Sequence, residues 1–225
     1  MKKKSLYIII SVLFLSLLMS FIDGFIKPPY LIKSVIKVVL FLVVPMLYFF
    51  LFKGEAGKFK KLFIPKSKDF FRALVLGVAV YGVIVGAYFL LRGVFDFTSI
   101  AGSLTEDVGV NAENFVYVAL YISFVNSLLE EFFFRGFAFI TLKEVINRKF
   151  AYAFSAALFS LYHVGMTAGW FHIVVFVLAF AGLFVGGLIF NYLNEKCKNI
   201  YPSWLVHMCA NFAINTIGFI LFGIM

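Results

Sequence analysis

Two adjacent carboxylates and an arginine interrupt an apolar run in Asn126-Ser-Leu-Leu-Glu130-Glu131-Phe-Phe-Phe-Arg135-Gly136. The ten residues before this stretch and the four residues after it carry no charge. Such flanks predict a helix inside a lipid bilayer. A charged side chain at the bilayer centre costs about 2.5–3.5 kcal/mol on insertion scales and more in simulations. Charged residues at that depth are therefore candidates for a functional site.

The composition of the whole chain also indicates a lipid bilayer as its environment. Hydrophobic residues make up 63% of the 225 positions and charged residues only 14%, and the mean hydropathy is +1.02. A water-soluble domain of this length keeps a polar surface that this composition does not supply. The apolar runs are continuous rather than alternating, which favours helices over a transmembrane β-barrel. The sequence therefore predicts an all-α polytopic membrane protein.

Seven transmembrane helices are predicted from the apolar runs. They cover about residues 5–22, 34–52, 72–91, 114–140, 150–166, 171–192 and 201–223. The first run follows three lysines as a signal peptide would, but no small-residue cleavage site follows it, so we expect it to stay as a span. The segment 92–113 is acidic and shows no apolar periodicity, so we expect a loop there.

The distribution of basic residues predicts the orientation. Fifteen of the 20 Lys and Arg residues lie in segments 1–4, 53–72, 141–149 and 194–199. Four others fall on the opposite side: Lys27, Lys33, Lys37 and Arg92. The excess of positive charge marks the cytoplasmic side, so the N-terminus is expected in the cytoplasm. Lys37 lies at a span end, where a lysine reaches the interface with its ammonium group.

The charge as a whole points to lipid as a partner. The net charge is +9, and no basic stripe lies on a soluble domain. This pattern indicates contact with anionic lipid headgroups rather than with nucleic acid. A short basic and aromatic piece, 58–63, fits either an amphipathic segment on the inner leaflet or a solvated loop.

Helical spacing places the carboxylates of Glu130 and Glu131 on different faces of their helix. Glu131 and Arg135 are four residues apart and share one helix face, so we expect them to pair. Glu130 lies about 100° further round the helix, which leaves its charge without a partner in its own helix. A purely structural arrangement, in which both acids pair with Arg135 and hold helices together, stays open on this pattern alone.

Polar residues also lie deep in two later spans. His163 ends Phe159-Ser-Leu-Tyr-His163, and His207 and Asn211 share a helix face in the last span. A lone intramembrane histidine often only bonds a neighbouring helix. An acid, two imidazoles and an amide from three helices would nevertheless suit hydrolysis of a peptide bond by an activated water. Asn126 and Ser127 lie one turn before Glu130 and could bond the site, whereas we expect Asn215 to bond a neighbouring helix.

The three motifs in this order resemble a known family. Glu-Glu-x-x-x-Arg, Phe-x-x-x-His and His-x-x-x-Asn on successive hydrophobic helices are similar to the CPBP intramembrane proteases, which include the CAAX prenyl-protein endopeptidases and the bacteriocin-processing or Abi proteins. The run Asn199-Ile-Tyr-Pro-Ser-Trp-Leu-Val-His207 fits the same family. The resemblance covers roughly residues 114–215. The first three spans match the family only in being hydrophobic. We therefore divide the chain into a three-span scaffold with a basic cytoplasmic loop over 1–113 and a four-span catalytic core over 114–225, together forming one integral membrane domain.

The resemblance implies roles for six residues. Glu130 and His163 would activate the water, His207 and Asn211 would stabilise the oxyanion, and Glu131 with Arg135 would hold the site together. The family has also been described as metalloproteases, in which case Glu130, His163 and His207 would bind Zn²⁺. The sequence contains no HExxH motif. Guided by the oxyanion site that His207 and Asn211 would form, we favour a metal-free glutamate mechanism with no cofactor, and the zinc alternative stays open.

The substrate class follows from the same resemblance. We expect a membrane-associated peptide or protein, either a prenylated CAAX tail or a bacteriocin-like or pheromone-like peptide, at the plasma membrane if the source is bacterial. A non-enzymatic bacteriocin-immunity or peptide-binding protein is the main rival. A proton-coupled transporter is disfavoured by the odd number of spans and the lack of an internal repeat.

Small residues predict close helix contacts. Gly182 and Gly186 form a GxxxG motif, and Gly187 follows it directly. Gly77, Gly82 and Gly86 repeat small residues along the third predicted span.

Overall fold

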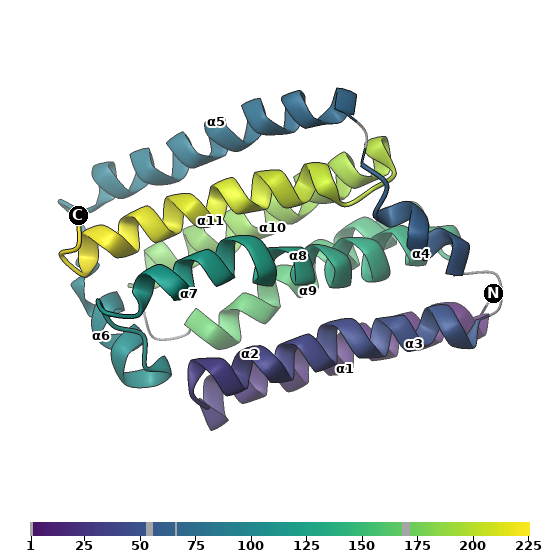
Figure 1. The fold of residues 1–225 in the computed structure, drawn as a ribbon, viewed down its shortest axis with the longest axis horizontal. Coiled ribbons are helices and arrows are strands. Elements are labelled where there is room, and N and C mark those ends of the chain that lie inside the picture. Colours follow the sequence, from purple (N-terminus) through teal and green to yellow (C-terminus); the bar gives the residue numbers. More distant parts are fainter. Residues whose placement is uncertain (1, 53–55, 66, 168–171) are drawn as a thin grey trace.

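A bundle of long helices makes up the computed structural model, which describes residues 2–52, 56–65, 67–167 and 172–225 (Figure 1). These ranges contain helices and connections but no strand. The α-helices are α1 (Lys2–Phe21), α2 (Tyr30–Val38), α3 (Val44–Leu51), α4 (Ala56–Leu62), α5 (Ser67–Leu91), α6 (Thr98–Val108), α7 (Phe115–Tyr121), α8 (Ser127–Glu130), α9 (Arg148–Thr167), α10 (Ile173–Cys197) and α11 (Tyr201–Leu221). The π segments are η1 (Ile22–Ile26), η2 (Val39–Val43), η3 (Ile122–Asn126) and η4 (Glu131–Thr141), and η5 (Leu142–Glu144) is a 3₁₀ turn.

Six helical rods within the described residues are long and apolar enough to cross a membrane. They are Lys3–Ile26, Tyr30–Leu51, Asp69–Leu91, Phe115–Glu144, Ile173–Cys197 and Tyr201–Leu221. Three of these rods are composite, because a π segment continues an α-helix without a break. The prediction of an all-α polytopic membrane protein is confirmed.

The fifth predicted span, 150–166, forms α9 but is not among the six. This helix has 20 residues, yet tyrosines, serines and His163 make it less apolar than the others. Within the bundle, α9 packs against α1, α10 and η4. The count of seven crossings and the cytoplasmic N-terminus stay predictions.

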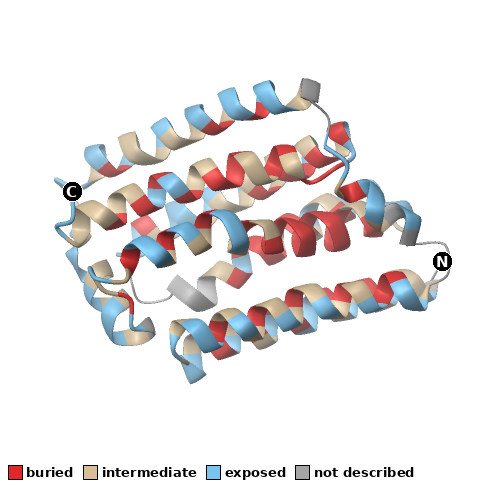
Figure 2. Ribbon diagram, viewed as in Figure 1, coloured by how far each residue is buried: buried red, intermediate tan, exposed pale blue. Residues whose placement is uncertain are grey.

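The rods lie roughly parallel to one another in the bundle. In Figure 1, α1 runs beside the α2–α3 rod along one edge, and α5 runs along the opposite edge next to α11. The rod from α7 to η4 lies between these edges. Buried residues gather in the middle of the bundle, where α8 meets α11 (Figure 2).

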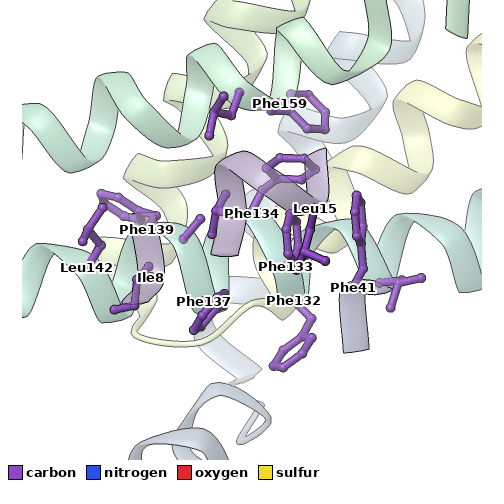
Figure 3. Close-up of a cluster of buried hydrophobic side chains, with 14 of the residues drawn as sticks. Ile8, Leu15, Phe41, Phe132, Phe133, Phe134, Phe137, Phe139, Leu142 and Phe159 are labelled. Atoms are coloured by element: carbon purple, nitrogen blue, oxygen red, sulfur yellow. The ribbon is translucent and has the colours of Figure 1, made fainter. Parts of the chain in front are cut away.

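Phenylalanines from η4 and its neighbours form the main core (Figure 3). The rings of Phe41 and Phe133 stack with centroids 4.0 Å apart and planes 6° from parallel. Helix α4 completes this core, because the Phe59 ring packs against Phe132 and buried Leu62 lies against Gly136. This piece is therefore a helix whose apolar side covers protein, and its placement on the inner leaflet stays a prediction.

Two sequence-based expectations about structure are wrong. Residues 98–108 form the helix α6 where a loop was expected, and this helix ends at Gly109 with φ +69°. In the described part of the structure, no atom of another helix lies within 4 Å of a Cβ added to Gly182 or Gly186, so these two glycines do not make the predicted close helix contact. The close contact falls one residue later, at Gly187, whose would-be Cβ lies 3.0 Å from Ala156 Cα in α9.

The Gly187 contact leads to a prediction about stability. Gly187→Ala places a methyl group against the Ala156 backbone, so we expect the free energy of unfolding to fall by about 1–3 kcal/mol. Gly186→Ala is the matched control, because it adds the same methyl group to the same helix where nothing lies within 4 Å. Chemical denaturation of both variants in one detergent checks the prediction. Equal stability of the two variants would contradict the α9–α10 packing.

Candidate active site

Glu130 and Glu131 lie at the junction of α8 and η4, in the middle of the bundle. Glu130 is 1% exposed and Glu131 is 0% exposed. A π turn at a helix junction is frequent at functional sites, because it redirects the side chains that follow. Side chains of neighbouring helices bond the backbone carbonyls of these π segments: Ser155 Oγ donates to Phe134 O at 2.8 Å, and Asn211 Nδ2 donates to Ile122 O at 3.1 Å.

The two oxygens of Glu130 have different surroundings. Oε1 accepts a hydrogen bond from the ammonium of Lys37 in α2 and another from Asn126 Nδ2 at 3.0 Å. Lys37 also donates to Asn126 Oδ1 at 2.6 Å, so the three side chains form a closed set. Oε2 accepts no hydrogen bond from the described part of the chain. It instead faces Nε2 of His207 at 3.6 Å and Nε2 of His163 at 3.8 Å.

Hydrogen bonds on the other ring nitrogens indicate where the histidine protons lie. His163 Nδ1 is 2.7 Å from Phe159 O, and His207 Nδ1 is 3.0 Å from Glu131 Oε1. A carbonyl and a carboxylate oxygen only accept, so each Nδ1 carries the proton and donates. In the neutral ring, each Nε2 then presents a lone pair toward Glu130.

Three acceptor atoms therefore converge on one point: Oε2 of Glu130 and the two Nε2 atoms. Acceptors do not bond one another, so a donor placed between them would satisfy all three. Polar contacts longer than about 3.5 Å are commonly bridged by water. A water molecule offers two O–H donors, which matches one carboxylate oxygen and one imidazole. The arrangement is suited to holding a water against a buried carboxylate.

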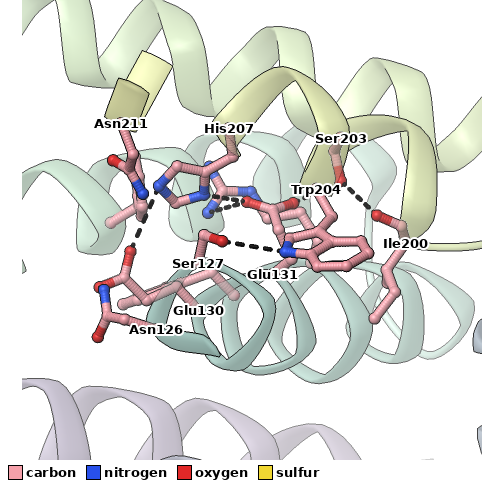
Figure 4. Close-up of polar contacts among 12 residues, drawn as sticks. Asn126, Ser127, Glu130, Glu131, Ile200, Ser203, Trp204, His207 and Asn211 are labelled. Atoms are coloured by element: carbon pink, nitrogen blue, oxygen red, sulfur yellow. Dashed lines mark hydrogen bonds and ion pairs between the residues drawn. The ribbon is translucent and has the colours of Figure 1, made fainter. Parts of the chain in front are cut away.

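Glu131 bonds Nδ1 of His207, on the side of the ring away from Glu130, and connects this ring to Ser203 and Arg135. Figure 4 shows His207 between the two carboxylates, with its ring reaching from α11 toward the α8–η4 junction. Glu131 also accepts a hydrogen bond from Ser203 and lies 3.5 Å from Arg135 Nη1. The predicted pairing of Glu131 with Arg135 is confirmed. The Arg135 guanidinium lies over the Phe159 ring, 4.0 Å from its centroid.

The two asparagines of α11 bond the α7–η3 rod. Asn211 bonds Ile122 O through one of the two N–H groups of its amide. Asn215 donates to Ala119 O at 3.1 Å and to Ser123 Oγ at 3.0 Å, as expected for a residue that bonds a neighbouring helix. Ser127 accepts a hydrogen bond from Trp204 Nε1 at 3.0 Å, which fixes the start of α8 against α11.

Two observations bear on whether Glu130, His163 and His207 could hold a zinc ion. Among the described residues, no group of three or more His, Cys, Asp or Glu side chains is placed to hold a metal. The Lys37 ammonium on Glu130 also sets a positive charge beside the position that a dication would take.

Sequence reasoning missed the closest partner of Glu130. Lys37 was expected to reach the membrane interface, but it is buried and pairs with the carboxylate. Glu130 therefore does have a partner for its charge, supplied by another helix. The available signal was the pair Lys33 and Lys37, two lysines one turn apart in an otherwise apolar helix. Ser203 was also missed, although it lies in the quoted run before His207.

The family model for Rce1-like proteins, described as type II CAAX prenyl endopeptidase Rce1-like, matches residues 112–213 of this chain. This range contains the acidic pair, Arg135, both site histidines and Asn211. No curated protein and no solved structure matches the chain.

Proposed function

Because the chain belongs, through residues 112–213, to the CPBP family of CAAX-type intramembrane endopeptidases, we propose that it hydrolyses peptide bonds with a water activated by Glu130. The protein is an integral membrane protease whose substrate is a peptide or protein at the membrane. One observation supports the proposed mechanism most strongly. The free oxygen of a buried glutamate faces the lone-pair nitrogens of two imidazoles.

The first step uses this convergence. A water between the three acceptors donates one hydrogen bond to Oε2 of Glu130 and the other to Nε2 of His163. As the water oxygen attacks the carbonyl carbon of the substrate, its proton passes to Glu130. General-base catalysis of this kind contributes about 10²–10⁴-fold to a rate.

The second step stabilises and then resolves the tetrahedral intermediate. Asn211 offers its remaining N–H to the oxyanion. His207 also donates through Nε2 in molecules whose His207 ring has taken up a second proton from water before the attack. The Glu131 carboxylate on Nδ1 balances the resulting charge on His207. As the C–N bond breaks, Glu130 returns its proton to the leaving amine. Arg135 holds Glu131 in place throughout.

Reconstitution in lipid vesicles tests the proposal. Purified wild-type protein is incubated with a farnesylated peptide ending in a CAAX sequence, the same peptide without the lipid, and a hydrophobic leader-like peptide. We expect mass spectrometry to detect both fragments of at least one peptide. If no peptide is cut, or if peptides bind without cleavage and alanine variants of Glu130 and His207 bind equally well, the peptide-binding alternative replaces this proposal.

Metal removal tests the choice of mechanism. We expect the cleavage rate to persist after prolonged dialysis against a chelator, since the proposed steps need only side chains and water. Elemental analysis of the dialysed protein provides the comparison. One zinc per chain that leaves together with activity, and restores activity when added back, would overturn the metal-free mechanism.

A further inference from the structure

A buried lysine from the N-terminal part of the chain reaches the candidate active site. Lys37 lies in α2, outside the matched segment 112–213, and is 5% exposed. Its ammonium bonds Oε1 of Glu130 and Oδ1 of Asn126, and it lies 4.9 Å from the centre of the Tyr162 ring. The steps proposed above give this side chain no role.

We propose that Lys37 is a positioning residue of the active site, which binds Oε1 of Glu130 and so directs Oε2 at the two imidazoles. The terminal torsion of a glutamate is broad and roughly two-fold, so an untethered carboxylate can present either oxygen. Lys37 and Asn126 both bond the same oxygen, which leaves only the other oxygen to face His163 and His207. This inference rests on the proposed role of Glu130 as the base.

The contact also makes the site depend on how the first two rods dock. Glu130 belongs to α8, whereas Lys37 comes from the α2–α3 rod, 93 residues earlier in the chain. The ring of Phe41, one turn after Lys37, stacks on Phe133, so apolar packing holds the same two rods together beside the ion pair. The N-terminal rods thus supply a group that orients the base.

A second ion pair in the same helix provides a matched control. Lys33 lies one turn before Lys37, is 7% exposed and pairs with Asp23 of η1 at 3.0 Å. It therefore shares residue type, helix and burial with Lys37. It ties α2 to the preceding turn, however, and not to the α8–η4 junction. Losing either lysine removes one buried ion pair, but only loss of Lys37 leaves Oε1 of Glu130 held by Asn126 alone.

The test measures kcat and KM separately in lipid vesicles for Lys37→Met, Lys37→Arg and Lys33→Met. The probe is the farnesylated CAAX peptide or whichever peptide of the panel the wild type cuts, and rates are counted per folded molecule. A base displaced by about 1 Å loses about 100-fold in rate, so we expect Lys37→Met to lower kcat by about that factor with KM little changed. Lys37→Arg, which keeps the charge, is expected to be intermediate. Lys33→Met is expected to keep the wild-type kcat.

The outcomes separate this inference from the function on which it rests. If the wild type cuts and Glu130→Gln does not, but Lys37→Met turns over as fast per folded molecule as Lys33→Met, the positioning role is overturned and the proposed function stands. If Lys37→Met does not fold, an experimental structure of the wild type in lipid decides, and a Lys37 ammonium that does not contact Oε1 of Glu130 overturns the role. If the wild type cuts none of the peptides, both proposals fail.

Discussion

Replacing Glu130 by glutamine is expected to lower kcat by about 10²–10⁴-fold, the range for loss of a general base. The amide keeps the shape of the side chain and an oxygen that Lys37 and Asn126 can still bond. It loses the ability to take a proton from the water held between Oε2 and the imidazoles, and it also loses the negative charge that pairs with Lys37. The measurement is the cleavage rate of the probe peptide in vesicles, counted per folded molecule.

An exposed carboxylate provides the control for this change. Glu106 lies on the exposed side of α6, far along the chain from the motif, and Glu106→Gln should leave kcat unchanged. A Glu130→Gln variant that turns over at the wild-type rate would remove Glu130 from the mechanism. A fall in kcat that is matched by Glu106→Gln would point to a general effect of lost negative charge.

Replacing Arg135 by methionine is expected to lower the free energy of unfolding by about 3–5 kcal/mol, the usual cost of leaving a buried charge without its partner. Arg135 and Glu131 are both fully buried, and their charged groups lie 3.5 Å apart. Methionine fills similar space, so the change removes the charge with little loss of packing against Phe159. Chemical denaturation in detergent provides the measurement.

Removing both charges tests whether the loss of stability in Arg135→Met comes from breaking its ion pair with Glu131. In the double variant Glu131→Gln with Arg135→Met, no buried charge is left alone, so we expect much of the lost stability to return. Arg72→Met is the exposed control and should have little effect. A double variant as unstable as Arg135→Met alone would show that the guanidinium acts through packing on the aromatic rings instead.

Features carried by local spacing could be predicted from the sequence. The apolar runs predicted six of the helical rods with shifts of a few residues at their ends, because a lipid-spanning helix has to be apolar along its length. The four-residue spacing of Glu131 and Arg135 predicted their contact. The same spacing placed His207 and Asn211 on one face of α11, and both face the α7–η4 rod.

Features set by tertiary contacts could not be predicted in this way. Lys37 lies near the start of its rod, so depth alone suggested an interfacial lysine, and only the docking of α2 against α8 brings it to Glu130. Gly187 rather than Gly182 or Gly186 meets α9, because the rotation of α10 about its axis decides which small residue faces a neighbour. Helix α6 was missed because its polar composition carries no strong apolar period.

An experimental structure of the wild-type protein in lipid, at a resolution that shows ordered water, tests the central claim most directly. We predict one water within hydrogen-bond distance of Oε2 of Glu130 and of Nε2 of His163 or His207, with Lys37 on the other carboxylate oxygen. Carboxylate and imidazoles that point apart with no space for a water between them would contradict the account. A zinc ion bound by Glu130, His163 and His207 would contradict the account equally.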